Sequence, residues 1–527
     1  DTTWSLSNSP YTVTGSILIP DGVTLTIEAG VTVKFNSGLY IKNEGVITAV
    51  GTSSNKITFE SNSVSPAKSD WSGIRIRPTG GSAIDGSQNY SSGSQFKHVI
   101  IKHADIGLYV YDTGLHVSYT EFDTNNYGVE IRKTDGVVID NSTFTENTAG
   151  IWSEYEDYSS TDYVQAISNT FIKNSTFSAN NYGIDLIMNQ RDFINLNITT
   201  NIFTENNIGI DFGGGGYGPR VHSVLISENI VYNSSSYGVN LNRVYGLGTG
   251  TSLDYPLEFT KNIVLNNAGG SLMFEYSPSV KFKIHKNILI SNTADVNNIA
   301  SIGSPSTSNH LFNNNTIISK GKNVYFGGSS SYHANNITFT NNLFGNSSNN
   351  DIIDIKYGTG HVFNNNNLIN PSSTAYFFKN QTVNSFNAEN NYWGTSTESE
   401  IQAAIYDYSD DFELGAVDYT PFLTALNTTA PISPPSNVTK SVLGSDVVLN
   451  WSANGESDLA GYKLHYGDPT GYSYTTTLDL GNVTNYTITG GDFDTEYSIT
   501  AYDTNLDGTD DMVDGNESWF SKANTLP

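Results

Sequence analysis

Residues 122–129 carry the sequence Phe-Asp-Thr-Asn-Asn-Tyr-Gly-Val, and the pattern apolar-x-x-Asn-x-x-Gly-aliphatic recurs along the chain. Further copies begin at Phe144, Phe177 and Phe203. Looser copies contain Gly107, without the Asn, and Gly238, with one residue added. The successive glycines are 21, 22, 33, 26 and 29 residues apart. A repeat of this size predicts a solenoid, in which each unit buries its apolar side by stacking on copies of itself.

Within each unit, apolar residues alternate with polar or small ones. In the segment 126–132, Tyr127, Val129 and Ile131 alternate in this way, and a period of two predicts strands. Gly, Asn, Ser and Thr fill the gaps, as expected of turns. The sequence therefore predicts an all-β fold, a parallel β-helix with a tight turn at each Asn-x-x-Gly. The repeated Asn side chains should hydrogen-bond from rung to rung, and the repeated Phe, Ile and Val should form the core. Only 398–406 has a helical pattern.

The charge balance limits the possible partners. The 527 residues include 25 Lys and Arg against 52 Asp and Glu, a net charge of −27. Such a surface disfavours nucleic acids, anionic membranes and, unless cations bridge them, strongly anionic polysaccharides. The chain has no Cys, which excludes disulfides and thiolate metal sites. It has no apolar run of 18 residues, so no membrane insertion is expected. A first residue other than Met suits a mature secreted protein, located outside the cell or on a bacterial surface.

Changes in composition predict four segments. Residues 1–95 form an N-terminal cap and the first rungs of the β-helix, and 96–425 form its body with a C-terminal cap. Residues 426–435 form a Pro-rich linker, which is extended and stiff. Residues 436–527 form a separate domain.

Two parts of the chain resemble known families. Asn390-Asn391-Tyr392-Trp393-Gly394-Thr395, with a short helix and a Pro-Phe end at 421–422, resembles the C-terminal end of secreted bacterial right-handed parallel β-helix repeat proteins. Residues 436–527 resemble a fibronectin type III domain in their segments 447–451, 459–466 and 493–502. The resemblance implies a right-handed parallel β-helix followed by a fibronectin type III-like β-sandwich. It also implies that Trp451 and Tyr497 are core residues.

The segment 503–514 has the spacing of a Ca²⁺-binding loop. Oxygen-bearing side chains occupy alternate positions, Gly508 is sixth and an acid is twelfth. Side chains at alternate positions converge on one cation, and the glycine permits the sharp turn. The predicted Ca²⁺ ligands are Asp503, Asn505, Asp507, Thr509 and Asp514. The alternative is a solvated acidic loop.

A column of outward-pointing side chains is the candidate functional site. The residue just after each repeat glycine points inward, so the next one should point outward. This column is Tyr109, Glu130, Trp152, Asp185, Asp211 and Asn240. Because neighbouring rungs lie ~4.8 Å apart, Asp185 and Asp211 would have the spacing of a glycosidase acid/base pair, with Glu130 as a further acid. The residues predicted to bind sugar are Tyr109, Tyr111, Trp152, Tyr155 and Arg132. Loops at 154–166, 187–197, 213–222 and 243–256 should border the groove.

Three interpretations of this column stay open: a polar solvent face or cation ladder, a sugar-binding face, and a catalytic site. The motifs of the polygalacturonase family are missing, as is the Lys/Arg-rich groove with which pectate and chondroitin lyases neutralise a uronate. The sequence therefore favours a non-catalytic extracellular protein, structural or adhesive, that binds polysaccharide or copies of itself. A polysaccharide hydrolase or lyase is the alternative.

Overall fold

The computed structural model describes most of the chain. The described residues are 1–153, 166–187, 192–213, 220–242, 244–246, 255–274, 280–293, 296–302, 309–328, 333–346, 350–369, 375–467 and 470–525. The chain divides into two compact units, which are described separately below. The first comprises Asp1–Phe282, Ile299–Asn309 and Gly327–Ala334, and the second comprises Lys283–Asn298, His310–Phe326 and Asn335–Pro527.

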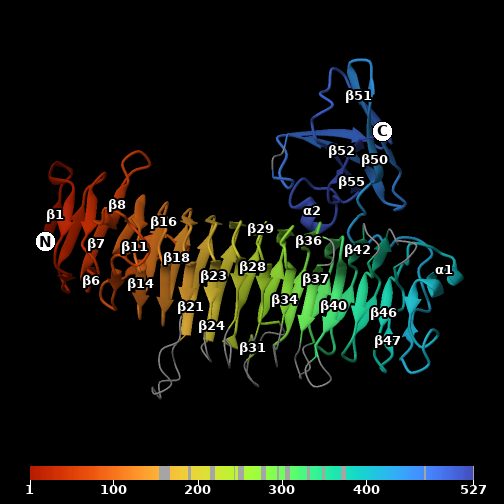
Figure 1. The fold of residues 1–527 in the computed structure, drawn as a ribbon, viewed down its shortest axis with the longest axis horizontal. Coiled ribbons are helices and arrows are strands. Elements are labelled where there is room, and N and C mark those ends of the chain that lie inside the picture. Colours follow the sequence, from red (N-terminus) through yellow and green to blue (C-terminus); the bar gives the residue numbers. More distant parts are fainter. Residues whose placement is uncertain are drawn as a thin grey trace. The chain divides into compact units, whose positions relative to one another are not determined.

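The first unit is a parallel β-helix whose rungs each contribute strands to three parallel sheets, here called A, B and C (Figure 1). In sheet A lie β1 (Thr2–Trp4), β4 (Thr24–Ile27), β7 (Val46–Val50), β12 (Gln95–Lys97), β15 (Leu115–Ser118), β18 (Asp135–Asp140), β21 (Ala166–Lys173), β24 (Asp192–Thr199), β27 (Arg220–Val221), β28 (Val224–Ser227), β31 (Tyr245–Gly246) and β32 (Leu257–Thr260). In sheet B lie β2 (Tyr11–Val13), β5 (Thr32–Phe35), β8 (Ile57–Ser61), β13 (Val99–Lys102), β16 (Glu121–Asp123), β19 (Thr143–Thr145), β22 (Thr176–Ser178), β25 (Ile202–Thr204), β29 (Ile230–Tyr232) and β33 (Ile263–Leu265). In sheet C lie β3 (Ile17–Ile19), β6 (Tyr40–Asn43), β9 (Gly73–Ile76), β14 (Ile106–Tyr111), β17 (Tyr127–Arg132), β20 (Ala149–Ser153), β23 (Tyr182–Leu186), β26 (Ile208–Asp211), β30 (Tyr237–Asn240) and β34 (Gly270–Phe274).

Two additions accompany these sheets. The antiparallel hairpin of β10 (Ser82–Ile84) and β11 (Tyr90–Gly93) packs beside β15. A short 3₁₀ helix, η1 (Leu6–Asn8), follows β1. The strands β35 (Phe282–His285), β37 (Asn297–Ile302) and β40 (Lys322–Gly327) each have residues in both units.

The second unit contains parallel rung strands of its own and a β-sandwich. Its rung strands are β36 (Ile288–Ser291), β38 (Leu311–Asn313), β39 (Thr316–Ser319), β41 (Thr338–Thr340), β42 (Leu343–Asn346), β43 (Ile353–Ile355), β44 (Val362–Asn364), β45 (Asn367–Ile369), β46 (Phe378–Asn380), β47 (Phe386–Asn387), β48 (Ile405–Tyr406) and β49 (Val417–Asp418). The helix expected near 398–406 is α1 (Glu398–Ala403). None of the helices in the described part of the chain has the length and apolar character that a membrane span requires.

The sandwich pairs two four-stranded sheets. One sheet holds β50 (Ser436–Leu443), β51 (Asp446–Ser452), β54 (Asn485–Ile488) and β57 (Asn524–Thr525). The other holds β52 (Leu459–Tyr466), β53 (Thr476–Gly481), β55 (Tyr497–Asp503) and β56 (Ser521–Lys522), and α2 (Asp511–Asp514) lies between its last two strands in sequence. Side chains of both sheets form one core, which includes Trp451 and Tyr497 as expected. The specific likeness to a fibronectin type III domain and the four segment boundaries stay predictions.

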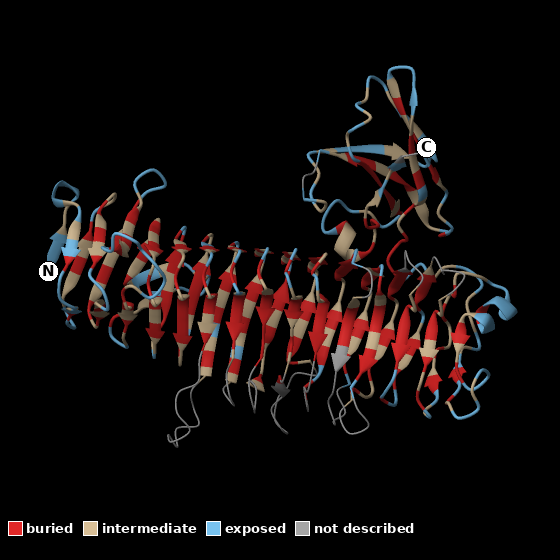
Figure 2. Cartoon of the chain, in the orientation of Figure 1, coloured by how far each residue is buried: buried red, intermediate tan, exposed pale blue. Residues whose placement is uncertain are grey.

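The predicted core and asparagine ladder of the first unit are confirmed. Buried and half-buried residues alternate along the strands (Figure 2). The repeat phenylalanines stack in a column, with ring centres 4.7 Å apart between Phe122 and Phe144 and 4.6 Å apart between Phe144 and Phe177. Beside them, the Asn147 amide nitrogen donates to Asn180 Oδ1 at 3.0 Å, and Asn125 donates in the same way to Asn147 Oδ1 at 3.1 Å. The stacked amides close the turn that precedes sheet C.

The repeat glycine lies inside the strand rather than in the turn. Gly128, for example, is the second residue of β17. A Cβ there would lie 2.5 Å from the carbonyl oxygen of Gly150 and 2.9 Å from a ring carbon of Phe144. The glycine is therefore required by the close approach of the stacked phenylalanines and the next strand, so the sequence-based placement in the turn was wrong.

Two of the predicted loops are shorter than expected. Residues 192–197 belong to β24 and 220–221 to β27, so they are part of sheet A. The backbone of Asn195 takes a left-handed conformation, with φ of 55°. This local break resets the apolar alternation between Phe193 and Leu196, which are both buried, and hides the strand from a period-two pattern. Most of the remainder of the four loops lies outside the described residues.

Candidate active site on the outward face of sheet C

The predicted outward column of the first unit exists, and its residues are in register on neighbouring strands. The Cα pairs are Tyr109 with Glu130, Glu130 with Trp152, Trp152 with Asp185, Asp185 with Asp211, and Asp211 with Asn240. The residues that flank each member along its strand point into the core, as Ile184 and Leu186 do on either side of Asp185. The alternation of strand side chains therefore directs the whole column away from the core.

Asp185 and Asp211 form a buried pair of carboxyl groups on adjacent rungs. Their exposed fractions are 4% and 7%, although both point away from the core. The side-chain amide of Asn240 donates to Asp211 Oδ1 at 3.0 Å. Among the described residues, Asp185 Oδ1 is buried without a hydrogen-bond partner. A buried polar atom without a partner costs free energy of folding, so its presence calls for a functional explanation.

The surroundings of this pair favour its protonated form. Burial, and secondly the charge of Asp211, raises the pKa of Asp185 to about 8. Burial also raises the pKa of Asp211 to about 7, and the hydrogen bond from Asn240 opposes that rise. The two groups titrate as a unit because like charges on adjacent strands repel. Near neutral pH the pair therefore contains both an acid that can donate a proton and a carboxylate that can accept one.

Aromatic side chains accompany the pair. Trp152 stacks on Tyr127 of the preceding rung, with ring centres 3.8 Å apart and planes inclined by 7°. On the other side, Trp152 is in register with Asp185 of the next rung. Tyr182 belongs to the same environment: burial, then the charges of Asp185 and Asp211, raises its pKa. We did not predict Tyr182 from the sequence. The signal was a Tyr directly before the repeat glycine, which also occurs at Tyr127.

The remaining predicted residues lie apart from the pair. Glu130 is fully buried and forms an ion pair with Arg132 Nε, and the rung of Trp152 lies between Glu130 and Asp185. The Arg132 guanidinium lies 5.3 Å from the ring centre of Tyr109, and that of Arg77 lies 5.2 Å from it. The structure thus separates Glu130 and Tyr109 from the acidic pair and assembles them into an internal cation–carboxylate–aromatic cluster.

Two further residues, Tyr111 and Tyr155, were predicted to bind sugar on this face. Tyr111 stacks on Tyr109 with ring centres 6.3 Å apart, which makes it a part of the same cluster. Tyr155 lies outside the described residues. Within the described ranges, no group of three or more His, Cys, Asp or Glu side chains has an arrangement that could hold a metal ion. The described polar neighbours within the pair's environment are the amide of Asn240 and the hydroxyl of Tyr182.

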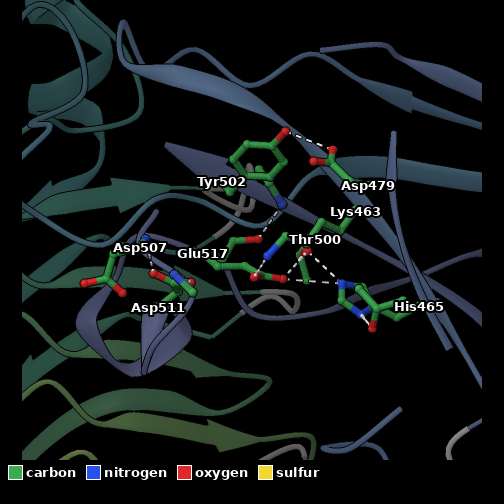
Figure 3. A network of polar contacts seen from close by, with 12 residues as sticks. Lys463, His465, Asp479, Thr500, Tyr502, Asp507, Asp511 and Glu517 are labelled. Carbon is green, nitrogen blue, oxygen red and sulfur yellow. Dashed lines mark hydrogen bonds and ion pairs between the residues drawn. The ribbon is translucent and has the colours of Figure 1, made fainter. Parts of the chain in front are cut away.

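The predicted Ca²⁺ loop is held by hydrogen bonds within itself (Figure 3). Asp503 Oδ1 accepts from the backbone N–H of Asn505 at 2.7 Å, and Asp507 Oδ1 accepts from that of Thr509 at 2.8 Å. The Asp511 carboxylate accepts from the N–H groups of Asp507 and Gly508, both at 2.9 Å. Burial raises the pKa of Asp503. The fifth predicted ligand, Asp514, ends α2. Binding of Ca²⁺ by these residues stays a prediction.

A buried polar network beside this loop was not predicted. Lys463 Nζ donates to Glu517 Oε2 at 2.5 Å, and Thr500 Oγ1 donates to Glu517 Oε1 at 2.7 Å (Figure 3). His465 Nε2 lies 2.9 Å from Thr500 Oγ1. Burial alone would raise the pKa of Glu517, but the hydrogen bonds from His465, Lys463 and Thr500 hold it below its usual value. Lys463, His465 and Thr500 alternate with core residues along β52 and β55, so this network covers the outer face of that sheet.

Comparisons with known proteins give one matching family model and several similar solved structures. Residues 1–97 match the family model described as a pectate-lyase like beta helix domain. Similar solved structures include a tailspike protein of E. coli bacteriophage HK620, with 10% identity over 93% of this chain and 84% of that chain, and a TM-score of 0.40. An alginate lyase from Paenibacillus sp. has 14% identity over 57% of this chain and 95% of that one, with a TM-score of 0.27. The spore cortex lytic enzyme SleM of Clostridium perfringens has 24% identity over 18% of this chain and 29% of its own length, with a TM-score of 0.14. No curated protein matches the sequence.

Proposed function

We propose that this chain is an extracellular polysaccharide hydrolase, with Asp185 and Asp211 as its acid and base and the outward face of sheet C as its binding face. The observation that carries the proposal is the register-paired, buried carboxyl pair, in which Asp185 and Asp211 both have a raised pKa. Hydrolysis of a glycosidic bond requires one carboxylic acid to protonate the leaving oxygen and one carboxylate to act as nucleophile or base. This departs from the non-catalytic role that the sequence alone favoured.

The spacing of the rungs supports a retaining mechanism. Adjacent parallel strands lie ~4.8 Å apart, close to the ~5–5.5 Å between the carboxyl groups of retaining glycosidases. In such a mechanism the group that loses its proton less readily, Asp185, protonates the departing oxygen. Asp211, whose charged form accepts the Asn240 hydrogen bond, attacks the sugar carbon. Water then releases the sugar, with Asp185 acting as base.

The polarity of the face supports hydrolysis over elimination. A lyase that acts on uronates needs a cation to neutralise the substrate carboxylate. Among the described residues of this face, Arg132 pairs with Glu130, and Asp211 accepts a hydrogen bond from the neutral amide of Asn240. The substrate class that fits is a neutral polysaccharide, whose rings stack on aromatic faces such as that of Trp152. Self-association of the chain stays a separate prediction.

The test is release of reducing ends from a panel of neutral and acidic polysaccharides by the purified full-length chain. Asp185→Asn and Asp211→Asn should each lower the rate by about 10²–10⁴-fold on a neutral substrate. The matched control is Asp354→Asn, because Asp354 is an equally buried aspartate on a rung strand of the second unit, β43, that instead pairs with Lys322. This control should keep its rate within about threefold.

Two outcomes would overturn the proposal. If no neutral polysaccharide yields products, or if Asp185→Asn cleaves as fast as the unaltered chain, the acidic pair is not catalytic. Retention on an immobilised polysaccharide distinguishes a binding protein: loss of retention in Trp152→Ala, but not in Trp4→Ala, would assign the face to binding alone. Trp4 is the matched control because it also stacks on a tyrosine, Tyr11, at 5.1 Å.

A further inference from the structure

A hollow lies on sheet A of the first unit, where the β10–β11 hairpin packs beside the rungs. Its volume is about 580 Å³, which is in the range of small-ligand sites. The hairpin contributes Ile84, Asp85 and Gln88 to the wall. The rungs contribute Asp135, Gly136, Asn169, Phe171 and Asn195, from β18, β21 and β24. It belongs to a different sheet from the acidic pair, and the proposed hydrolysis does not use it.

The polar wall of this hollow is a hydrogen-bonded ladder. Asn195 Nδ2 donates to Asn169 Oδ1 at 2.7 Å, and Asn169 Nδ2 donates to Asp135 Oδ1 at 2.7 Å. Asn169 and Asn195 have left-handed backbones, with φ of 47° and 55°, a conformation that Asn tolerates better than most residues. The left-handed residue interrupts the strand alternation at the same position on both rungs. The two amides are thereby lined up in a fixed row along the hollow.

The hollow also has an apolar part and acidic groups. Phe171 is half-buried and lines the hollow together with Ile84. Lys173 Nζ donates to Gln88 Oε1 at 2.8 Å, which orients that amide at the rim. Among the described residues that line the hollow there is no Lys, Arg or His, whereas Asp85 and Asp135 are acidic. The lining therefore offers an aromatic surface, amides and carboxylates, and it opposes an anionic ligand.

We propose that this hollow binds a neutral saccharide, separately from the catalytic face. Sugar hydroxyls both donate and accept, so they match a row of amides and carboxylates. The C–H face of a pyranose packs on an aromatic ring such as that of Phe171. Uronates and sulfated sugars are disfavoured because the carboxylates of Asp85 and Asp135 line the hollow and repel their charge. Such a site would hold the polymer on the solenoid while a different segment reaches sheet C.

The test measures binding of fluorescently labelled cellohexaose, xylohexaose, mannohexaose and hexagalacturonate to the full-length chain by thermophoresis. All variants are made in the Trp152→Ala background, so that the aromatic face of sheet C does not contribute. At least one neutral hexasaccharide should bind with a Kd below about 1 mM. Phe171→Ala and Asn169→Ala should each weaken that binding by about tenfold.

Each variant has a matched control. Asn174 is also exposed and left-handed and donates to an aspartate of the preceding rung, Asp140, at 2.8 Å, but it does not line the hollow. Leu225 is an outward apolar residue in register with Asn197, one rung beyond the hollow. Asn174→Ala and Leu225→Ala should keep the affinity within about twofold.

The inference is overturned if no neutral hexasaccharide binds, if hexagalacturonate binds more tightly than all of them, or if Asn169→Ala and Asn174→Ala have equal affinities. Failure of the proposed hydrolysis would leave these measurements unchanged, because Asp185 and Asp211 belong to another sheet. Circular dichroism of Phe171→Ala and Asn169→Ala verifies that both variants remain folded. Asn169→Asp is a second variant at this position, in which the side chain keeps its size but loses its amide donor.

Discussion

Two stacks of identical polar side chains occur in the same solenoid, and they have opposite character. Asn125, Asn147 and Asn180 form a buried column in which every amide donates to the next side-chain oxygen. Asp185 and Asp211 form a buried column in which Asp185 Oδ1 has no hydrogen-bond partner among the described residues. An amide carries a donor and an acceptor, so a stack of amides satisfies itself, whereas an ionised carboxylate only accepts.

Repeating one residue type on successive rungs therefore adds up its effect on stability, whether that effect is favourable or unfavourable. A repeated Asn stabilises the fold at each copy, and the interior stack is built from it. A repeated Asp accumulates repulsion and lost solvation, which appears here as raised pKa values. Groups with perturbed pKa values are concentrated at functional sites.

The largest effect is expected from placing a carboxylate in the interior stack. Asn147→Asp would direct oxygens at the carbonyl of Phe122 and at Asn180 Oδ1, which the amide nitrogen now satisfies. The free energy of unfolding at pH 7 should fall by about 4 kcal/mol, measured by urea denaturation. Asn207→Asp is the control, because Asn207 donates to Asn181 in a ladder near the surface. Equal losses in the two variants would contradict the distinction between the stacks.

The next effect is a gain in stability when the acidic stack is neutralised. The folded-state pKa values of about 8 and about 7 lie above the usual 3.8. The folded chain therefore binds more protons than the unfolded chain between about pH 4 and pH 8, and its stability falls as pH rises through that window. Asp211→Asn should raise the free energy of unfolding by about 2 kcal/mol at pH 8 and by almost nothing at pH 4. Asp354→Asn, which removes the partner of Lys322, should change it in the opposite direction.

The third effect concerns the pH dependence of polysaccharide cleavage. Hydrolysis needs the pair with one proton, a state that is most populated between the pKa values of about 7 and about 8. Activity should reach its maximum in that interval and decline by about tenfold one pH unit beyond either end. Initial rates on the neutral polysaccharide measure this profile. About equal rates at pH 5, pH 6 and pH 7 would contradict a mechanism in which Asp185 and Asp211 hold one proton between them.

The smallest effect is expected for Glu130. Its carboxylate is already paired with Arg132, and the rung of Trp152 separates it from Asp185. Glu130→Gln should therefore change the cleavage rate by less than about threefold, although it removes the charge of the Glu130–Arg132 ion pair and lowers stability. Rates and urea denaturation are measured on the same preparation. A loss of rate as large as that of Asp185→Asn would make Glu130 a member of the catalytic site.

Much of the solenoid could be predicted because its determinants are local and repeated. The spacing of Phe144, Asn147 and Gly150 identifies a rung without reference to other parts of the chain. Once rungs are aligned on these residues, the register of Asp185 with Asp211 follows directly. The prediction failed where the backbone departs from the period, as at Asn195, whose left-handed conformation concealed β24.

The sequence by itself determined the rung pattern, the composition of the core and which side chains share a column, because each depends on alternation and spacing within one repeat. Only the tertiary structure decided that Asp185 and Asp211 are buried, that Arg132 neutralises Glu130, and that the β10–β11 hairpin helps to enclose a hollow on sheet A. Burial and ion pairing depend on which distant segments cover a residue. No local period in the sequence records that information.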